Sequence, residues 1–255
     1  MIVDSHAHLQ WPDLAADLDG VLARAEAVGV THTIVIGTDL ESSRRAAEIA
    51  EARPRLFATA GIHPCSAREH GPGHFDVLER LIASGSFVAV GETGLDQFHS
   101  GTADRAEQLD WFHFQLDLAV RHDRPVVIHC RDAFADVLDC LEAHPRTRGV
   151  VHCFSEGPAE QEAFLERGLH ISFAGPVTRK NAKRLRAAAR ATPEDRLLVE
   201  TDSPFLAPAG SPDRRNEPSG ARAVLETLAA LRGVDPESLA AATAANTAGL
   251  FGLDL

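Results

Sequence analysis

The sequence of 255 residues is poor in several residue types that would assign it to a particular environment. It has no tyrosine and one methionine, and no unbroken apolar run reaches the length needed to cross a bilayer. Its first residues form a short apolar stretch interrupted by Asp4 and His6, without the basic and long apolar regions of a secretion signal. We therefore expect a cytoplasmic protein with no membrane partner.

The four cysteines form no Cys-x-x-Cys pair. Without a secretion signal, this pattern indicates reduced thiols rather than a disulfide framework or a thiolate zinc site. The sequence also lacks the glycine-rich loops that bind nucleotides and the Gly-x-Ser-x-Gly turn of serine hydrolases. These absences exclude chemistry driven by a bound nucleotide and covalent chemistry at a serine.

Positive charge is scarce, because 25 Lys and Arg residues against 37 Asp and Glu residues give a net charge of −12. Such a chain does not attract polyanions over a long range, so a nucleic-acid partner would need a local basic patch. The densest basic cluster consists of Arg179, Lys180, Lys183, Arg184 and Arg186. It is either a solvated helix face or, in its first turn, a contact for a nucleic-acid backbone.

Eight short apolar segments alternate with stretches whose apolar residues recur at helical spacing. The segments are continuously apolar, which is typical of parallel strands covered by helices. Eight such units match a single (β/α)₈ TIM-like barrel of the α/β class over residues 1–255. The alternative is an open doubly wound sheet, but residues 4–8 stand where that fold usually has a glycine-rich loop. The predicted strands are 1–3, 31–36, 56–60, 87–90, 125–128, 149–151, 170–173 and 196–199.

Two of the thirteen histidines, His6 and His8, stand two residues apart at the end of the first predicted strand. Because side chains alternate along a strand, both imidazoles point to the same side. Neutral imidazole is a good ligand for Zn²⁺ and its neighbours in the transition series. Taken alone, the pair fits equally well as two hydrogen-bonded core histidines.

Four further polar groups follow predicted strands in the same way: Glu92, His129, His152 and Asp202. Carboxyl ends of barrel strands meet at one rim, so we expect all six side chains to converge there. They exceed what one tetrahedral ion needs, which favours two divalent ions bridged by a carboxylate or hydroxide. Such a pair favours hydrolysis, because it supplies hydroxide at neutral pH and clamps the oxygens of a phosphodiester.

Nine separated motifs, in order, resemble the TatD family of metal-dependent hydrolases. They are VDSHAHL, GIHP, GETGLD, VVIHCRDA, HCF, ISFAGPVTRKNAKRLR, LLVETDSPFLAP, RRNEP and ANTAGLFGL. The resemblance implies a barrel related to amidohydrolases that acts as a deoxyribonuclease dependent on divalent metal (Mg²⁺, Mn²⁺ or Zn²⁺), often from 3′ to 5′ on single strands. It implies that His6, His8, Glu92 and Asp202 hold one ion. It also implies that Glu92, His129 and His152 hold the other, so that Glu92 bridges the two.

The sequence departs from the family's usual pattern at two positions. Gln97 stands where members often have a tyrosine, and Leu109 where they often have an arginine. Both positions lie outside the implied ligand set. The departures bear on substrate preference, because a missing aromatic ring removes a possible stacking surface for a base.

Several residues outside the ligand set are candidates for substrate binding, each with a structural alternative. His63 could contact a phosphate or a ligand water, or bond to its own loop. Arg131 could hold a phosphate oxygen through two hydrogen bonds, or pair with Asp132. Lys180 could guide a nucleic-acid backbone or remain solvated. Arg215 could guide the same backbone or fix its own loop.

Three acidic residues, Asp4, Asp96 and Asp132, could orient histidine ligands or could cap turns. We expect hydrolysis of DNA at single strands or 3′ ends, with Asp202 as the proton acceptor, Glu92 as the shared ligand and the chain acting as a monomer. Two alternatives stay open. One is an amidohydrolase or D-aminoacyl-tRNA deacylase with the same metal centre, and the other is a metal-binding interaction module without catalysis.

Overall fold

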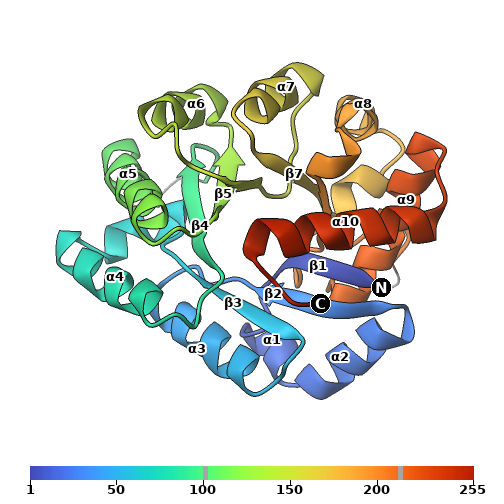
Figure 1. The fold of residues 1–255 in the computed structure, drawn as a ribbon, viewed down its shortest axis with the longest axis horizontal. Helices are drawn as coiled ribbons and strands as arrows, with labels where there is room; N and C mark the ends of the chain where they lie inside the picture. The colour runs from blue at the N-terminus through green and yellow to red at the C-terminus, as the bar shows by residue number, and fades with distance from the viewer. Residues whose placement is uncertain (100–102, 212–214) are drawn as a thin grey trace.

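The computed structural model, which describes residues 1–99, 103–211 and 215–255, contains eight parallel strands in one sheet (Figure 1). Each strand pairs with the next strand of the sequence, in the order β1 to β8. This order confirms the barrel and excludes the doubly wound sheet, whose order reverses at a switch point. The strands are β1 (Ile2–Ala7), β2 (Val30–Val35), β3 (Leu56–Ala60), β4 (Ala89–Asp96), β5 (Val126–Arg131), β6 (Gly149–Val151), β7 (His170–Phe173) and β8 (Leu197–Val199).

Helices surround the barrel in Figure 1. Two of them begin with reciprocal caps, in which an aspartate accepts from a backbone N–H and the side chain three residues on accepts in return: Asp39 with Ser42, and Asp104 with Glu107. The helices are α1 (Pro12–Ala15), α2 (Leu18–Ala27), α3 (Leu40–Glu51), α4 (Phe75–Ala83), α5 (Arg105–Arg121), α6 (Phe134–Ala143), α7 (Pro158–Glu166), α8 (Lys183–Ala191), α9 (Ala221–Arg232) and α10 (Pro236–Phe251).

The interior of the barrel is filled by apolar side chains and closed at one end by α10. Leu250 and Phe251, at the end of this helix, pack against an inner cluster that includes Ile34, Val127 and Leu198. The Arg148 guanidinium, just before β6, donates to the backbone oxygen of Leu250. Figure 1 shows α10 lying across this end, so the amino ends of the strands are covered and the carboxyl ends remain for the site.

Strands β1 and β8 are joined at the carboxyl rim by the residues that follow β8. The backbone N–H of Asp202 donates to the oxygen of His6 at 2.9 Å, and the N–H of His8 donates to the oxygen of Ser203 at 2.8 Å. The buried Asp4 carboxyl accepts from the backbone N–H of Thr201 at 2.9 Å and from its hydroxyl at 2.6 Å. These bonds bring His6, His8 and Asp202 together although almost 200 residues separate them in sequence.

Two other expectations bear on the whole chain. The four cysteines form no disulfide, as expected. Within residues 1–99, 103–211 and 215–255, no helix has the length and apolar character needed to span a membrane.

Candidate metal centre

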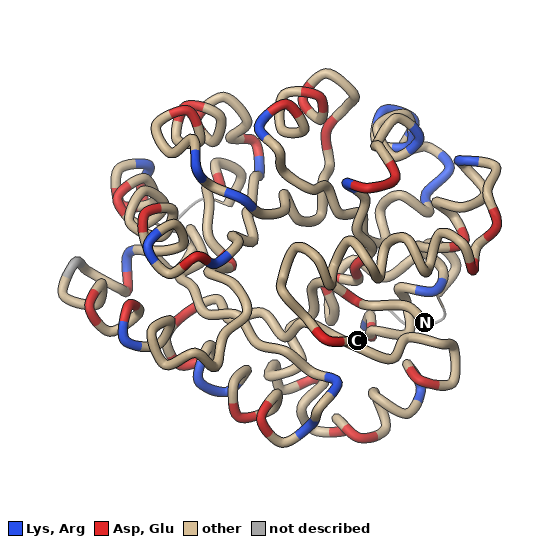
Figure 2. Tube along the Cα trace, in the orientation of Figure 1, with Lys and Arg blue, Asp and Glu red and all other residues tan. Residues whose placement is uncertain are grey.

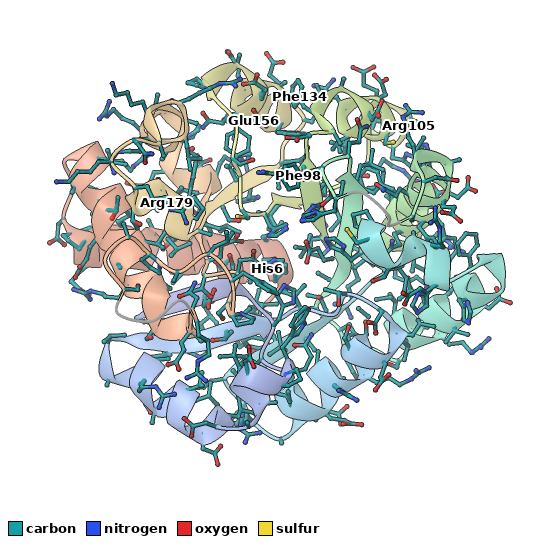
Figure 3. All side chains as sticks on the ribbon, turned by 180° about the vertical axis from the view of Figure 1, so that it is seen from behind. His6, Phe98, Arg105, Phe134, Glu156 and Arg179 are labelled. Carbon is teal, nitrogen blue, oxygen red and sulfur yellow. The ribbon has the colours of Figure 1, made fainter. Side chains whose placement is uncertain are left out.

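Four of the predicted ligands form a first group of donors at the carboxyl ends of β1, β4 and β8. The Nε2 atoms of His6 and His8 lie 3.3 Å apart. Asp202 Oδ1 lies 3.5 Å from His6 Nε2 and 3.3 Å from His8 Nε2. Glu92 Oε2 completes the group at 3.4 Å and 3.8 Å from the same two nitrogens. Two imidazoles and two carboxylates therefore converge at one point, and Figure 3 shows His6 near the centre of this end of the barrel.

The second oxygen of Glu92 faces three other histidines, of which His152 also has a donor atom within 4.8 Å of donors from His6 and Asp202. Glu92 Oε1 is 2.7 Å from His152 Nε2, 2.9 Å from His129 Nδ1 and 3.4 Å from His63 Nε2. The structure thus brings all six predicted ligands together and adds His63. Because each oxygen of Glu92 faces a different group, this buried carboxylate has the placement of a ligand shared between two groups of donors.

The remaining nitrogens of three histidines face buried oxygens, and the contacts of His8 and His129 are hydrogen bonds, which fix the orientation of those rings. His8 Nδ1 lies 3.1 Å from the backbone oxygen of Ile36. His129 Nε2 lies 3.0 Å from Asp96 Oδ2. His152 Nδ1 lies 3.5 Å from Oε1 of Glu200. Asp96 was among the candidates for this positioning contact, whereas Glu200 was not.

Glu200 is fully buried, and its other oxygen accepts from the Ser172 hydroxyl at 2.6 Å. The sequence carried a signal for it. Glu200 and Asp202 stand two residues apart after an apolar segment, as His6 and His8 do. Because side chains alternate along a strand, this spacing predicts that both carboxylates point to the same side.

The charges of the centre suit a cation. Burial acts to raise the pKa of Glu92, but His152, His63 and the contact with His129 hold it well below its usual range. Burial also opposes ionisation of Asp202, yet the contact with His8 keeps the pKa of Asp202 below its ordinary value. Both groups are therefore carboxylates at neutral pH.

The histidines of the centre differ in the direction in which their pKa is shifted. Burial lowers the pKa of His6 and lowers the pKa of His63 to about 3, so both imidazoles are neutral. Burial also acts against protonation of His152, but Glu92 and Glu200 raise its pKa well above the ordinary value. The buried carboxylates therefore attract positive charge, which either a proton or a divalent cation supplies. Nitrogen and carboxylate donors with their lone pairs directed at common points fit a cation of the Zn²⁺ or Mn²⁺ type.

His63 is bonded to its own loop, and its ring also faces the centre. Its Nδ1 accepts from the backbone N–H of Cys65 at 3.0 Å, as a residue bonded to its own loop would. Its Nε2 at the same time faces Glu92. The loop bond therefore directs the second nitrogen into the centre.

No hydrogen bond or ion pair joins the remaining candidates to the donors of the centre within the described residues. The Arg131 guanidinium lies over the ring of Phe98, 4.6 Å from its centroid, and no ion pair with Asp132 is found among the described residues. Arg215 donates to the backbone oxygen of Asp13 and to Glu217, as expected for a residue that fixes a loop. Lys180 is exposed in the segment between β7 and α8.

The acidic positioning candidates other than Asp96 do not contact histidine rings in the described structure. Asp4 bonds to Thr201 and to the backbone N–H of His6, so it connects strands rather than holding a ring. Asp132 is exposed, with a φ of 52°.

Comparison with known proteins agrees with this geometry. The profile of the family described as "TatD related DNase" matches residues 3–252. A protein of Escherichia coli (strain K12), "Uncharacterized metal-dependent hydrolase YcfH", is 39% identical over 258 residues, which cover 99% of this chain and 96% of that protein. The "3'-5' ssDNA/RNA exonuclease TatD" of Citrobacter rodentium is 37% identical over 259 residues, covering 99% and 98%.

Among solved structures, that of YJJV, a TatD homologue from Escherichia coli K12, superposes with a TM-score of 0.93 at 32% identity. The match covers 99% of this chain and 98% of that one. The chain therefore belongs to the TatD family of metal-dependent hydrolases.

Proposed function

We propose that the protein is a nuclease that hydrolyses phosphodiester bonds of single-stranded DNA from the 3′ end, with two divalent ions bound by the centre. The observation that carries the proposal is the placement of Glu92, whose two oxygens face different groups of donors. Names of relatives such as "3'-5' ssDNA/RNA exonuclease TatD" support the choice of substrate.

In this proposal each ion has its own ligand set. His6, His8, Asp202 and Glu92 would hold the first, and His129, His152 and Glu92 the second, with His63 beside it. When bound, two ions lower the pKa of a water molecule and offset the charge that develops on a phosphate.

Asp202 is the residue placed to accept the proton of the attacking water. Its side chain is 15% exposed, against 4% for Glu92, so it is the more accessible of the two carboxylates to a water on the substrate side. Its lowered pKa keeps it ionised at neutral pH, as a general base must be. Glu92, by contrast, is enclosed by histidines and serves as the shared ligand.

Arg131 is the candidate for binding a non-bridging phosphate oxygen. It follows His129 by two residues, and within the described residues no acid forms an ion pair with it. Its guanidinium therefore retains donors for a phosphate.

The test is hydrolysis of a 5′-labelled single-stranded oligonucleotide after chelation and after return of Mg²⁺, Mn²⁺ or Zn²⁺. We expect activity to disappear with the chelator and return with metal. Asp202→Asn should lower kcat by at least about 100-fold, the usual contribution of a positioned base. Glu226→Gln, on the outer helix α9, is the matched control and should retain full activity. Turnover of amide or aminoacyl esters, with none of DNA, would contradict the choice of substrate.

A further inference from the structure

Three tryptophan and phenylalanine rings are exposed among the described residues, and all three follow strands that carry donors of the metal centre. Trp11, Phe98 and Phe205 are 39%, 56% and 41% exposed. Trp11 follows β1, Phe98 follows β4 and Phe205 follows β8. Single exposed apolar side chains are common on protein surfaces, whereas adjoining ones mark a binding site. Trp11 and Phe205 adjoin each other.

Trp11 and Phe205 form one unit beside the first group of donors. Their ring centroids are 4.9 Å apart and their planes are nearly perpendicular, at 86°. The ring of His8 lies 6.0 Å from Trp11 and 6.1 Å from Phe205. The pair therefore lies next to His8, one of the residues that would hold an ion.

The Trp11 ring packs against Phe205 and lies near His8, and 39% of the residue stays exposed. Its backbone begins α1, but its side chain makes no capping hydrogen bond. A surface depression of about 200 Å³, lined in part by Gln10, Trp11 and Thr38, adjoins the ring. The ring thus presents surface to solvent rather than filling the core.

Phe98 lies on the other side of the barrel, because β4 is distant from β1 and β8 in the strand order. One face of this ring carries the Arg131 guanidinium. Figure 3 shows Phe98 and His6 at the same end of the barrel, so aromatic surface is present on both sides of the centre. Arg131 covers one face of Phe98, whereas among the described residues no guanidinium lies over Trp11 or Phe205, so we take the Trp11–Phe205 pair as the stacking surface.

We propose that the Trp11–Phe205 pair is the platform on which the base next to the scissile phosphate stacks, and that it selects unpaired strand ends over duplex ends. The inference rests on the proposed nuclease function. Bases of any identity stack on aromatic side chains, whereas a base within a duplex already has both faces covered. A platform adjacent to His8 holds the base while its phosphate reaches the metal donors. In this proposal, the Trp11–Phe205 pair is the cause of the protein's preference for single strands.

Intrinsic fluorescence provides a direct test, because the chain has two tryptophans and the other, Trp111, is buried. We expect a phosphorothioate oligothymidylate, which resists hydrolysis, to quench the emission of Trp11 in a saturable manner. In Trp11→Phe, the emission of Trp111 should not respond to the same oligonucleotide. Unchanged emission of the unaltered protein at saturating oligonucleotide would contradict the proposal.

Binding and kinetics of variants supply the second test. Trp11→Ala and Phe205→Ala should each raise Kd for the oligonucleotide, measured by anisotropy, and KM for cleavage by about 10-fold or more, with kcat changed less than 3-fold. Trp11→Phe should restore most of the affinity, since it keeps an aromatic face. Val234→Ala, an exposed apolar residue between α9 and α10, is the matched control and should bind as the unaltered protein does.

The outcomes separate the two proposals. If the unaltered protein cleaves single strands and Trp11→Ala binds and cleaves them equally well, the platform is overturned and the nuclease proposal stands. If the unaltered protein neither binds nor cleaves any oligonucleotide, both are overturned.

Discussion

At the scale of single residues, the orientation of each histidine depends on the atom that faces its second nitrogen. Asp96 Oδ2 lies 3.0 Å from His129 Nε2, and Glu200 Oε1 faces His152 Nδ1 across a longer contact of 3.5 Å. Loss of such an acceptor frees the ring to rotate and to change tautomer, which weakens metal binding without removing a ligand.

We expect Glu200→Ala to lower the affinity for Zn²⁺ by about 10- to 100-fold, the usual effect of removing a supporting acceptor. Glu200→Gln keeps an oxygen acceptor for His152 and should lose less. Competition with a chromophoric chelator measures both values, with Glu226→Gln as the control. Equal affinity of Glu200→Ala and the unaltered protein would show that Glu200 does not position His152.

At the scale of elements, the contact between β1 and β8 joins the first and last strands of the sheet. Asp4 is buried at this contact and accepts from both the backbone and the hydroxyl of Thr201. Burial raises the pKa of Asp4 to about 8, so the carboxyl is largely protonated at neutral pH. Asparagine is then a close mimic of this residue.

Asp4→Ala should therefore lower the free energy of unfolding by about 1–3 kcal/mol, because it leaves the buried N–H of Thr201 without an acceptor. Asp4→Asn should cost less than Asp4→Ala. Urea unfolding followed by circular dichroism measures the difference, and the exposed Asp19→Ala serves as the control. A midpoint for Asp4→Ala equal to that of the unaltered protein would mean that this bond does not hold the strands.

The elements also show what the sequence could and could not predict. Apolar segments located all eight strands, yet β1 continues through His6 to Ala7 and β4 through Glu92 to Asp96. Both predicted segments end too early, because a search for apolar runs stops at the first polar residue. These strands bury polar side chains at the rim, where other donors satisfy them.

Contacts between distant segments were harder to predict than the strands. The convergence of His6, Glu92, His129 and Asp202 was predictable because parallel strands share a carboxyl end. The stacking of Arg131 on Phe98 was not, since nothing in the local pattern distinguishes it from a salt bridge with Asp132. Gln97 stands where relatives often have a tyrosine, but the next residue, Phe98, is aromatic and lies outside the matched motifs.

At the scale of the whole molecule, acidic and basic residues are unevenly distributed. Figure 2 shows basic residues gathered on and before α8. Arg184 pairs there with Glu156 and Glu160, whereas no ion pair is found for Arg179, Lys180 or Lys183 within residues 1–99, 103–211 and 215–255. These three residues offer the local positive charge that a chain of net charge −12 needs to bind a polyanion.

Lys180 allows a quantitative test of this charge. Each phosphate contact to a single strand contributes about 0.7 to the slope of log K against log salt concentration. Lys180→Gln should reduce that slope for oligothymidylate by about this amount. Arg222→Gln, whose guanidinium pairs with Glu226 and Glu237 on the outer helices, should leave it unchanged. An unaltered slope for Lys180→Gln would exclude a phosphate contact at this residue.

The most direct measurement of the central claim is the number of divalent ions per chain. Elemental analysis of the protein equilibrated with Zn²⁺ or Mn²⁺, together with anomalous scattering from crystals, gives both the number and the positions. With Glu92 shared between the two groups of donors, the result should be two ions per chain, each contacted by one Glu92 oxygen, and at most one ion in Glu92→Gln. A single ion per chain at saturation, or two ions of which neither contacts Glu92, would contradict the account.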